Sequence, residues 1–374
     1  MKPFIACIAM AILLVAAAAD GAARMGPGEE LVLFPAFATP AEDGTAWNAE
    51  INGWFFDPTR KAAIQQKIGE SLLELSKAAP ANPTQHERDN ARERLHMFFV
   101  DSESGRQLAV QVGSDTLPVT GCGTPKRATS GGDGLLHGCV RIPASLVPAG
   151  EGRILFRAAE APTVEGVIRF IQATGVSIVS DIDDTIKVTE VNNHSAMLRR
   201  TFYEDFEPVR GMAEVYSAWA RSTPSLHVHY VSASPWQLYR FLTELLESRG
   251  FPPGTFHLKQ FRFKNPHEFV HFFTQAPDRY KIATIEPIMK ALPKRCFVLI
   301  GDSGEKDPEA YAALSAKHRD QVARIFIRDL TGQGRRAGRY VKAFSAVPDP
   351  VWAVFSEPSE LPSTLPSDCP AAAR

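Results

Sequence analysis

Four uninterrupted apolar runs, each ending in polar residues, constrain the fold of this 374-residue chain more than any other feature. They occupy residues 177–183, 227–233, 296–302 and 323–329, and helix-like segments separate them. Strands that are buried on both faces and alternate with helices form a parallel sheet covered on both sides. The sequence therefore predicts an α/β domain over residues 170–345. In such a sheet the ligand lies beyond the carboxyl ends of the strands, so the polar residues there carry the functional argument.

Residues 30–165 follow a different pattern, with short β-like runs separated by turn residues. The runs are ELVLFPAF, INGWFFD, HMFFVDSE, RQLAVQV, GCVRIP and GRILFRAAE. Two helix-like stretches, residues 61–78 and 86–95, interrupt them. The pattern predicts a mainly-β, sandwich-like domain with a helical insertion. It holds no catalytic constellation, and we expect a packing or docking role for it.

The first 23 residues resemble a secretory signal peptide. A short positive start precedes an apolar, Ala-rich stretch over residues 3–19, and small residues suited to a signal peptidase follow it. The alternative is an uncleaved anchor, for which this stretch is at the short limit of a membrane span. We expect cleavage and export to the periplasm or the medium.

Cleavage would remove Cys7 and leave Cys122, Cys139, Cys296 and Cys369. An even number of cysteines in an oxidising compartment permits two disulfides. Cys122 and Cys139 flank a Gly-rich loop and suit a local bridge. A bridge between Cys296 and Cys369 would tie the Pro- and Ser-rich tail, residues 357–374, to the core. Three connectivities are open, and free buried thiols are the alternative.

Aspartates follow two of the apolar runs. The first run ends in Asp181 and Asp183, and Thr185 completes a DxDxT motif. The third run ends in Asp302, which begins a DxxxxD spacing with Asp307. A phosphate dianion repels carboxylates, so several aspartates at one sheet edge need a cation to invert the local field. Mg²⁺, which prefers a few carboxylate or carbonyl oxygens together with phosphate and water, suits such a set.

Two further residues occupy the expected places around these aspartates. Ser232 ends the second apolar run, and Lys281 lies in a helix-like segment 21 residues before Asp302. The DxDxT motif alone is weak, because three common residue types match it by chance in some chains of this length. Four elements in this order, three of them at apolar strand ends, are jointly specific.

At these residues the chain resembles the haloacid dehalogenase superfamily of phosphotransferases, over about residues 170–335. Residues 179–191, 230–239 and 299–311 resemble more closely the catalytic domain of the phosphatidate phosphatases first known from the yeast actin-patch protein. The resemblance implies a haloacid-dehalogenase-like, Rossmannoid parallel sheet. It also implies Mg²⁺-dependent hydrolysis of phosphatidate to diacylglycerol and phosphate.

The resemblance also assigns roles to the residues of the motifs. Asp181 would attack phosphorus and form an aspartyl-phosphate, and Asp183 would act as general acid and then as general base. The Asp181 and Asp302 carboxylates and the Asp183 backbone carbonyl would bind Mg²⁺. Lys281 and Ser232 would hold the phosphoryl oxygens, with Thr185 at the phosphate or bonded to the loop backbone.

Other residues near the motifs have plainer interpretations. Asp307 precedes a proline, so it is either a helix N-cap or part of the metal site. Ser234 is interpreted as the N-cap of a helix over residues 235–249, and Asp184 as structural or solvated. His227 and His229 alternate on one strand and are expected to be satisfied core histidines.

Two segments are candidates for recognising a lipid. Residues 255–273 interleave six phenylalanines with basic residues, among them Lys259 and Arg262, which suits an anionic lipid surface; a buried strand and helix is the alternative. Residues 187–210 are expected to form a flap over the site. The candidate headgroup contacts are Lys187, Arg199, Arg200, Lys259 and Arg262. The expected partner is therefore a phospholipid at a membrane surface.

The composition argues against nucleic acid as a binding partner. Lys plus Arg number 41 and Asp plus Glu 42, so the net charge of −1 gives no global field that would attract nucleic acid, and we expect none as a partner. A phosphatase for another phosphomonoester shares the same motifs. A binding module that has lost catalysis, or a protein whose main function lies in the β-rich half, are the non-enzymatic alternatives.

Overall fold

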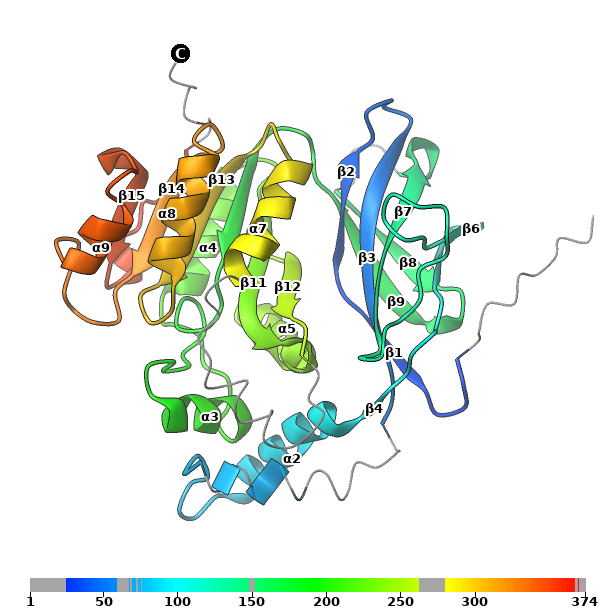
Figure 1. Ribbon diagram of the computed structural model, residues 1–374, viewed down its shortest axis with the longest axis horizontal. Helices are drawn as coiled ribbons and strands as arrows, with labels where there is room; N and C mark the ends of the chain where they lie inside the picture. The colour runs from blue at the N-terminus through cyan, green and yellow to red at the C-terminus, as the bar shows by residue number, and fades with distance from the viewer. Residues whose placement is uncertain are drawn as a thin grey trace, which may run out of the picture.

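The computed structural model describes residues 25–58, 67–147 apart from 68, 72 and 75, residues 152–261, 280–366 and residue 369. The predicted signal peptide lies outside these residues. Within them, the chain forms two sheets that lie beside each other, one mainly antiparallel and one parallel (Figure 1). No helix in this part of the chain combines the length and the apolar character needed to cross a bilayer.

The second half of the described chain forms a six-stranded sheet in which every pairing is parallel. Its strands are β10 (Val176–Ser180), β11 (His227–Pro235), β12 (Thr255–Lys259), β13 (Cys296–Asp302), β14 (Val322–Arg328) and β15 (Trp352–Phe355). Their order is β12-β11-β10-β13-β14-β15. The four predicted runs are β10, β11, β13 and β14, which confirms the fold class. The edge strands β12 and β15 complete the sheet.

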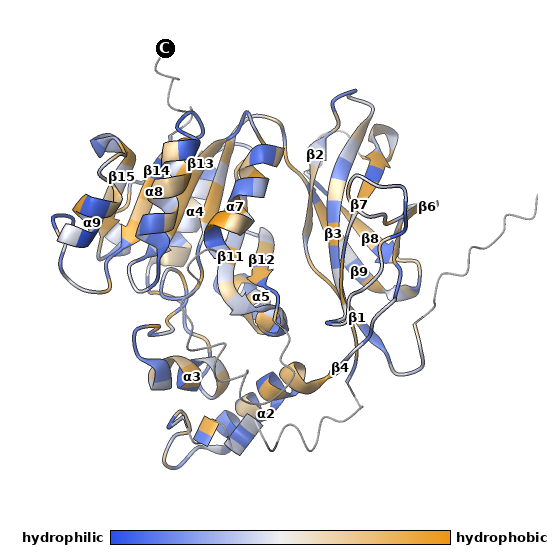
Figure 2. Cartoon of the chain, viewed as in Figure 1, coloured by the Kyte–Doolittle hydropathy of each residue, from blue (hydrophilic) through white to orange (hydrophobic). Residues whose placement is uncertain are grey.

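Helices cover both faces of the parallel sheet, as the continuous apolar strands require. They are α3 (His194–Phe202), α4 (Met212–Ser222), α5 (Tyr239–Ser248), α7 (Tyr280–Ala291), α8 (Asp307–Lys317) and α9 (Gly338–Ala343). Short 3₁₀ turns follow β11, precede β15 and follow β15, at η2 (Trp236–Leu238), η3 (Asp349–Val351) and η4 (Pro358–Glu360). Ile285 and Tyr311, from α7 and α8, pack with Val179 and Leu299 on one face. Helices α4 and α5 cover the other face, so apolar residues concentrate between the layers (Figure 2).

The first half forms one nine-stranded sheet rather than two separate ones. Its strands are β1 (Glu30–Leu33), β2 (Ala36–Pro40), β3 (Ala46–Asp57), β4 (Asp101–Ser102), β5 (Ala109–Val112), β6 (Asp115–Pro118), β7 (Leu135–Pro143), β8 (Arg153–Ala158) and β9 (Ala161–Phe170); the 3₁₀ turn η1 (Ala144–Leu146) follows β7. The long strand β3 pairs with β1 and β2 and with β7, and the sheet encloses its own apolar core. This mainly-β arrangement confirms the predicted character of the domain.

One predicted strand is instead the end of a helix. Helix α2 spans Gln85–Phe99 and starts with a capping box between Thr84 and Glu87. The run HMFFVDSE was interpreted as a strand, but only Asp101–Ser102 of it form one. Leu95, Phe98 and Phe99 are buried, as are the earlier positions of the same helix face, so helical periodicity decides their conformation.

Helix α2 contacts the expected flap. Its Phe98 ring lies 5.5 Å from the Phe202 ring of α3. The Arg94 guanidinium donates to the backbone carbonyls of Thr201 at 2.9 Å and Glu204 at 2.7 Å. An inserted helix of the β-rich half therefore supports the segment that follows the first motif, beneath α3 in Figure 1.

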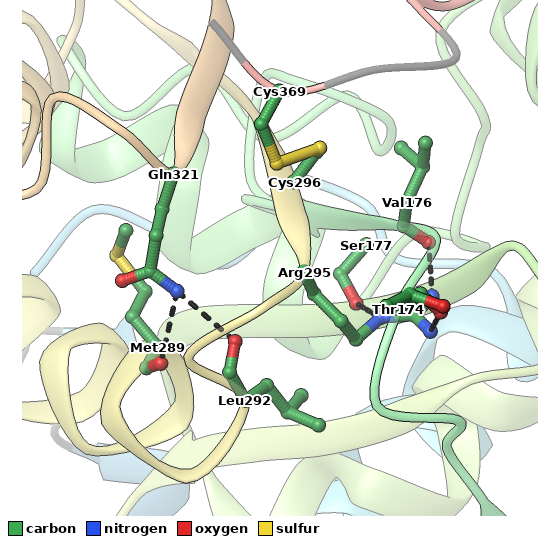
Figure 3. The surroundings of a disulfide bond; sticks show 9 residues. All are labelled: Thr174, Val176, Ser177, Met289, Leu292, Arg295, Cys296, Gln321 and Cys369. Atoms are coloured by element: carbon green, nitrogen blue, oxygen red, sulfur yellow. Dashed lines mark hydrogen bonds between the residues drawn. A yellow bond between two sulfur atoms is a disulfide. The ribbon is translucent and has the colours of Figure 1, made fainter. Parts of the chain in front are cut away.

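The tail is attached to strand β13 of the parallel sheet and to helix α4, which covers that sheet. Cys369 is bonded to Cys296 at the start of β13 (Figure 3). The Trp219 indole donates to the Pro362 carbonyl at 2.7 Å, and Leu361 is buried nearby in the core. A second disulfide joins Cys122 and Cys139, which are 17 residues apart. The described part of the tail is thus packed onto the domain, although its composition gives it little capacity to fold alone.

Candidate active site

The candidate site lies at the carboxyl ends of β10 and β13, which are neighbours at the centre of the parallel sheet. The strand order reverses direction between these two strands, and this is where open α/β sheets bind ligands. The Asp181 N–H donates to the Ile300 carbonyl at 2.9 Å, which fixes the end of β10 against β13. Asp181 and Asp302 are therefore brought together although 121 residues separate them in the sequence.

Three buried carboxylates converge at this place. Asp181, Asp302 and Asp307 each offer an oxygen, and these oxygens lie within 4.8 Å of one another. Asp302 Oδ1 accepts from the Gly304 N–H, whereas Oδ2 is buried and has no hydrogen-bond partner among the residues that the structure describes. A buried carboxylate oxygen without a donor is costly unless a cation binds it. This oxygen fits a metal ligand.

Gly301 makes room for this arrangement. A Cβ at position 301 would lie 2.8 Å from the Asp307 Cγ, and still closer to its carboxylate oxygen. The neighbouring Asp302 N–H donates to Asp307 Oδ2 at 3.2 Å. Gly301 and Asp302 therefore have different roles at the site. Gly301 leaves room for the Asp307 side chain, and Asp302 presents its own carboxylate.

Lys281 is the single cation among these carboxylates in the described residues. Its Nζ lies 3.0 Å from Asp181 Oδ1 and 3.2 Å from Glu305 Oε2, and it also contacts Asp307. The lysine is buried, at the start of α7. Burial opposes its charge, but the carboxylates of Asp181, Asp307 and Glu305 outweigh burial and hold the pKa of Lys281 well above its usual value.

The cluster carries more negative than positive charge. With all groups ionised, the four carboxylates and one ammonium sum to −3. Burial, followed by the negative neighbours, raises the pKa values of Asp181 and Asp302 well above those of free carboxyls, although Lys281 acts against this. An all-oxygen, carboxylate-rich donor set of this kind fits a hard divalent cation, which would relieve the repulsion.

Asp183 occupies a separate environment two residues after Asp181. Its Oδ1 accepts from Lys187 Nζ and from Thr189 Oγ1, each at 2.8 Å. Its Oδ2 accepts from the hydroxyls of Ser232 at 2.8 Å and Ser234 at 2.7 Å. Burial disfavours its charge, but Lys187 and the hydroxyl donors outweigh burial and hold the pKa of Asp183 far below its usual range. The pKa of Asp181 is thus raised, whereas that of Asp183 is lowered.

The loop after β10 is closed by its own side chains. The Asp184 carboxylate accepts the backbone N–H groups of Thr189, Glu190 and Val191 at 2.7–2.8 Å. Asp184 adopts a positive φ of 54°, which an aspartate tolerates when its side chain bonds locally. The Thr185 hydroxyl donates to Asp181 Oδ2 at 3.0 Å. Asp184 is therefore structural, and Thr185 orients the Asp181 carboxylate.

The comparisons with known proteins coincide with this part of the chain. Residues 176–329 match the family model described as phosphatidate phosphatase APP1, catalytic domain. This segment is similar to the catalytic domain of the phosphatidate phosphatase APP1 family.

Two curated relatives of the family match over the same length. Phosphatidate phosphatase APP1 of Saccharomyces cerevisiae is 35% identical over 162 residues, which cover 42% of this chain and 27% of the yeast protein. An uncharacterized protein of Schizosaccharomyces pombe is 30% identical over 163 residues, which cover 43% of this chain and 26% of that protein. The chain thus spans about a quarter of the length of these relatives.

Within this family segment, the structure brings together the residues that were singled out from the motifs. Asp181, Asp302, Asp307 and Lys281 form one cluster. Asp307 begins α8, where no side-chain cap is formed, and its carboxylate faces Lys281 instead. The N-cap interpretation of Asp307 therefore does not describe its contacts.

Two predictions from the sequence need correction. Lys187 was expected to contact a headgroup, but it is only 2% exposed and is paired with Asp183. Ser234 was interpreted as a helix N-cap, but its hydroxyl contacts Asp183, and α5 begins later, at Tyr239. The Ser232 hydroxyl, which was expected to hold a phosphoryl oxygen, lies at the site and donates to Asp183, and its phosphate role stays a prediction.

The other candidate headgroup contacts have different surroundings. Arg199 pairs with Glu204, and Arg200 pairs with Glu190 and Glu204, so neither presents an unpaired charge. Lys259 ends β12 at the carboxyl edge of the sheet, half-buried; burial lowers its pKa, against the charge of Glu305. Arg262 lies outside the described residues, as do most of the phenylalanines of residues 255–273.

The sequence interpretation missed two functional-site residues. Glu305 pairs with Lys281, and burial followed by like charges raises its pKa. Thr189 bonds both Asp183 and Lys187. The only signal for Glu305 was its place between Asp302 and Asp307, since an acidic residue after a strand is usually solvated. Thr189 gave no signal, because its position depends on how the loop closes.

Proposed function

We propose that this chain is a Mg²⁺-dependent phosphatidate phosphatase, which hydrolyses phosphatidate to diacylglycerol and phosphate through an aspartyl-phosphate on Asp181. The observation that carries the proposal is the convergence of Asp181, Asp302 and Asp307 around Lys281, inside the segment that matches the catalytic-domain family. The chemistry is that of the haloacid dehalogenase type, to which the DxDxT motif points.

The residues that would hold Mg²⁺ are Asp181 and Asp302, with Asp307 beside them. The unpartnered Asp302 Oδ2 and the negative charge of the cluster support this assignment. When bound, the cation neutralises the carboxylates and polarises the phosphoryl oxygens, so that an anionic substrate can approach an anionic nucleophile.

Asp181 is placed to act as the nucleophile. Thr185 and Lys281 hold its two carboxylate oxygens, at 3.0 Å each, so the side chain is oriented before substrate arrives. A carboxylate oxygen of Asp181 forms a bond to phosphorus while the bond from phosphorus to the alkoxide oxygen breaks. Lys281 stabilises the phosphoryl oxygens as charge moves, because its ammonium lies next to the attacking group.

Asp183 transfers a proton in both steps of the reaction, first as general acid and then as general base. It donates a proton to the leaving alkoxide, and then takes one from the water that attacks the aspartyl-phosphate and releases phosphate. Its four donors favour the ionised form, which suits the second half. A phosphate dianion beside it raises its pKa by like-charge repulsion, and this favours protonation for the first half.

The substrate class is supported by the family and by the edge of the site. The yeast relative is named a phosphatidate phosphatase. Lys259 lies at the carboxyl end of β12. A cation at this place would attract an anionic headgroup. The two disulfides support export, because disulfides persist in oxidising compartments.

A phosphate-release assay tests the proposal. Phosphatidate in mixed micelles, lysophosphatidate and soluble phosphomonoesters are compared, with Mg²⁺ and with EDTA. We expect phosphatidate to be preferred, EDTA to abolish turnover, and Asp181→Asn to lower the rate by about 10³-fold or more. Asp320→Asn, at an exposed position, is the matched control and keeps full activity.

Two results would contradict the proposal. Full turnover by Asp181→Asn would remove the nucleophile, and turnover of soluble monoesters alone would assign a different substrate. A non-catalytic binding module is disfavoured because the nucleophile, its lysine and both carboxylate partners are all present in one cluster.

A further inference from the structure

A pocket lies between the two sheets, away from the carboxylate cluster. Its volume is about 830 Å³, within the range of small-molecule sites. One wall comes from the β-rich half, with Trp47, Arg153 and Arg169. The other wall comes from residues 223–228, which lead into β11 and include its first two residues, and from residues 252–253, which precede β12. The pocket therefore opens at the amino ends of the parallel strands, whereas the carboxylate cluster lies at their carboxyl ends.

Two arginines of this pocket face each other across neighbouring strands. Arg153 of β8 and Arg169 of β9 are direct partners in the antiparallel register. Like charges directly opposite on a sheet destabilise it. Burial, followed by the charge of Arg153, lowers the pKa of Arg169. The pair therefore costs folding free energy, and nothing within the pair compensates for it.

No carboxylate of the described residues forms an ion pair with either arginine of the pair. Arg169 Nε is buried and has no hydrogen-bond partner in this part of the chain. No aspartate or glutamate is found among the described residues that line the pocket. Elsewhere on the same strands, Arg157 is paired with Glu165 at 3.0 Å, so unpaired arginines are not a general property of this sheet.

The neighbourhood adds further positive charge. Arg295 is fully buried beside the pocket and donates to the Ser177 hydroxyl and to backbone carbonyls such as that of Val176 (Figure 3). It also donates to the carbonyls of Gln172 and Ser225, two residues that line the pocket. No carboxylate of the described residues pairs with its charge. His227 lines the same pocket, but burial holds its pKa well below the usual value, so it adds no charge at neutral pH. The positive charge at the pocket comes from the arginines.

We propose that this interdomain basic pocket binds a phosphoryl group carried on a partly apolar body. Two adjacent guanidinium groups present paired N–H donors that match a phosphate dianion. Trp47, Phe170 and Pro224 supply apolar walls for the rest of the molecule. A lipid headgroup and a soluble phosphate ester share this chemistry. The proposal is independent of phosphatase activity at the carboxylate cluster.

Binding is measured on the full chain in EDTA, which suppresses cation-dependent phosphate binding at the carboxylate cluster. Isothermal titration uses inorganic phosphate and glycerol 3-phosphate. Co-sedimentation uses phosphatidylcholine vesicles with and without phosphatidylglycerol. The variants are Arg169→Gln and Arg153→Gln, and Arg157→Gln is the control because it removes an arginine of β8 that has its own carboxylate.

We expect binding of at least one probe to weaken about tenfold or more in Arg169→Gln and Arg153→Gln and to be unchanged in Arg157→Gln. If these two variants bind only glycerol 3-phosphate more weakly, the ligand is a soluble phosphate ester. If they bind only the anionic vesicles more weakly, the ligand is a lipid headgroup. Both results support the proposed site. Absence of binding by every probe, or equal binding by all the variants, overturns it. Because Arg169 has no described partner to lose, its replacement should not lower the melting temperature.

Discussion

Lys187 Nζ lies 2.8 Å from Asp183 Oδ1, and the lysine is almost fully buried in doing so. A residue expected on the lipid-facing surface is therefore part of the machinery that sets the charge of the proposed general acid and base. Its ammonium also lies 4.8 Å from the centre of the Phe206 ring, so that its position is fixed from two sides.

Replacement of Lys187 by Gln should raise the pKa of Asp183, because the lysine charge is the largest factor that lowers it against burial. If ionised Asp183 limits turnover at low pH, the acid limb of the kcat/KM profile moves to higher pH. Lys187→Arg keeps the charge and should move the limb less. A profile unchanged in Lys187→Gln would separate Lys187 from the catalytic proton.

Replacement of Asp302 by Asn should change how Mg²⁺ affects stability. Burial and the Asp307 charge raise the pKa of Asp302, so its ionised form destabilises the fold at neutral pH when no cation is bound. In EDTA the variant should melt no lower than the wild type, and Mg²⁺ should raise the melting temperature of the wild type alone. An equal Mg²⁺ response in both would contradict the ligand assignment; Asp320→Asn is the control that keeps the response.

Gly301→Ala should disrupt the site, because the added methyl group overlaps the Asp307 carboxylate. We expect a loss of about 1–3 kcal/mol in unfolding free energy together with a loss of activity. Gly338→Ala is the matched control, since a Cβ there meets nothing within 4 Å. Urea unfolding of both variants checks this, and equal stability of the two would show that Asp307 moves without cost.

The two disulfides should contribute unequally to stability. Cys296 and Cys369 enclose a separation of 73 residues, and Cys122 and Cys139 one of 17. The chain-entropy relation gives about 4 kcal/mol for the longer loop and about 3 kcal/mol for the shorter. Double Cys→Ala replacement of each pair, followed by chemical unfolding, measures the difference. A larger loss for the shorter loop would contradict the expectation.

Acidification should destabilise the fold through a buried histidine cluster. Burial lowers the pKa of His257 to about 4, and burial also depresses the pKa values of His227 and His229. The unfolded chain binds these protons more readily, so stability is fully present above about pH 6.5 and falls as the pH drops toward 4. His257 alone accounts for about 3 kcal/mol across this window.

The variant His257→Gln tests this assignment, because glutamine cannot titrate in the window. Its melting temperature should depend less on pH than that of the wild type, while His86→Gln, at an exposed histidine, should behave as the wild type. Equal pH slopes in all three proteins would place the acid sensitivity elsewhere.

Much of the parallel sheet could be predicted, because strands that are buried on both faces have continuous apolar sequences. The edge strands β12 and β15, of five and four residues, gave weaker patterns. The run from His96 to Phe99 was ambiguous for a different reason. Four apolar or aromatic residues in succession fit a strand and a buried helix end equally well, and only their packing decides.

The candidate site was predictable where topology alone fixes it. Asp181 and Asp302 follow two strands that the parallel order makes neighbours, so their convergence follows from the strand pattern. The partners of Asp183 were not predictable. Lys187, Thr189 and Ser234 reach it only through the loop closed by Asp184 and the irregular end of β11, which are properties of the folded chain.

Helix α2 reaches α3 from the other half of the chain, through Phe98 and Arg94. Transplanting the family segment onto an unrelated carrier would therefore leave the underside of α3 bare, with an aromatic ring and two carbonyl groups facing water. Such a chimaera would retain the whole carboxylate cluster. It would still lack α2, which supports the expected flap over residues 187–210.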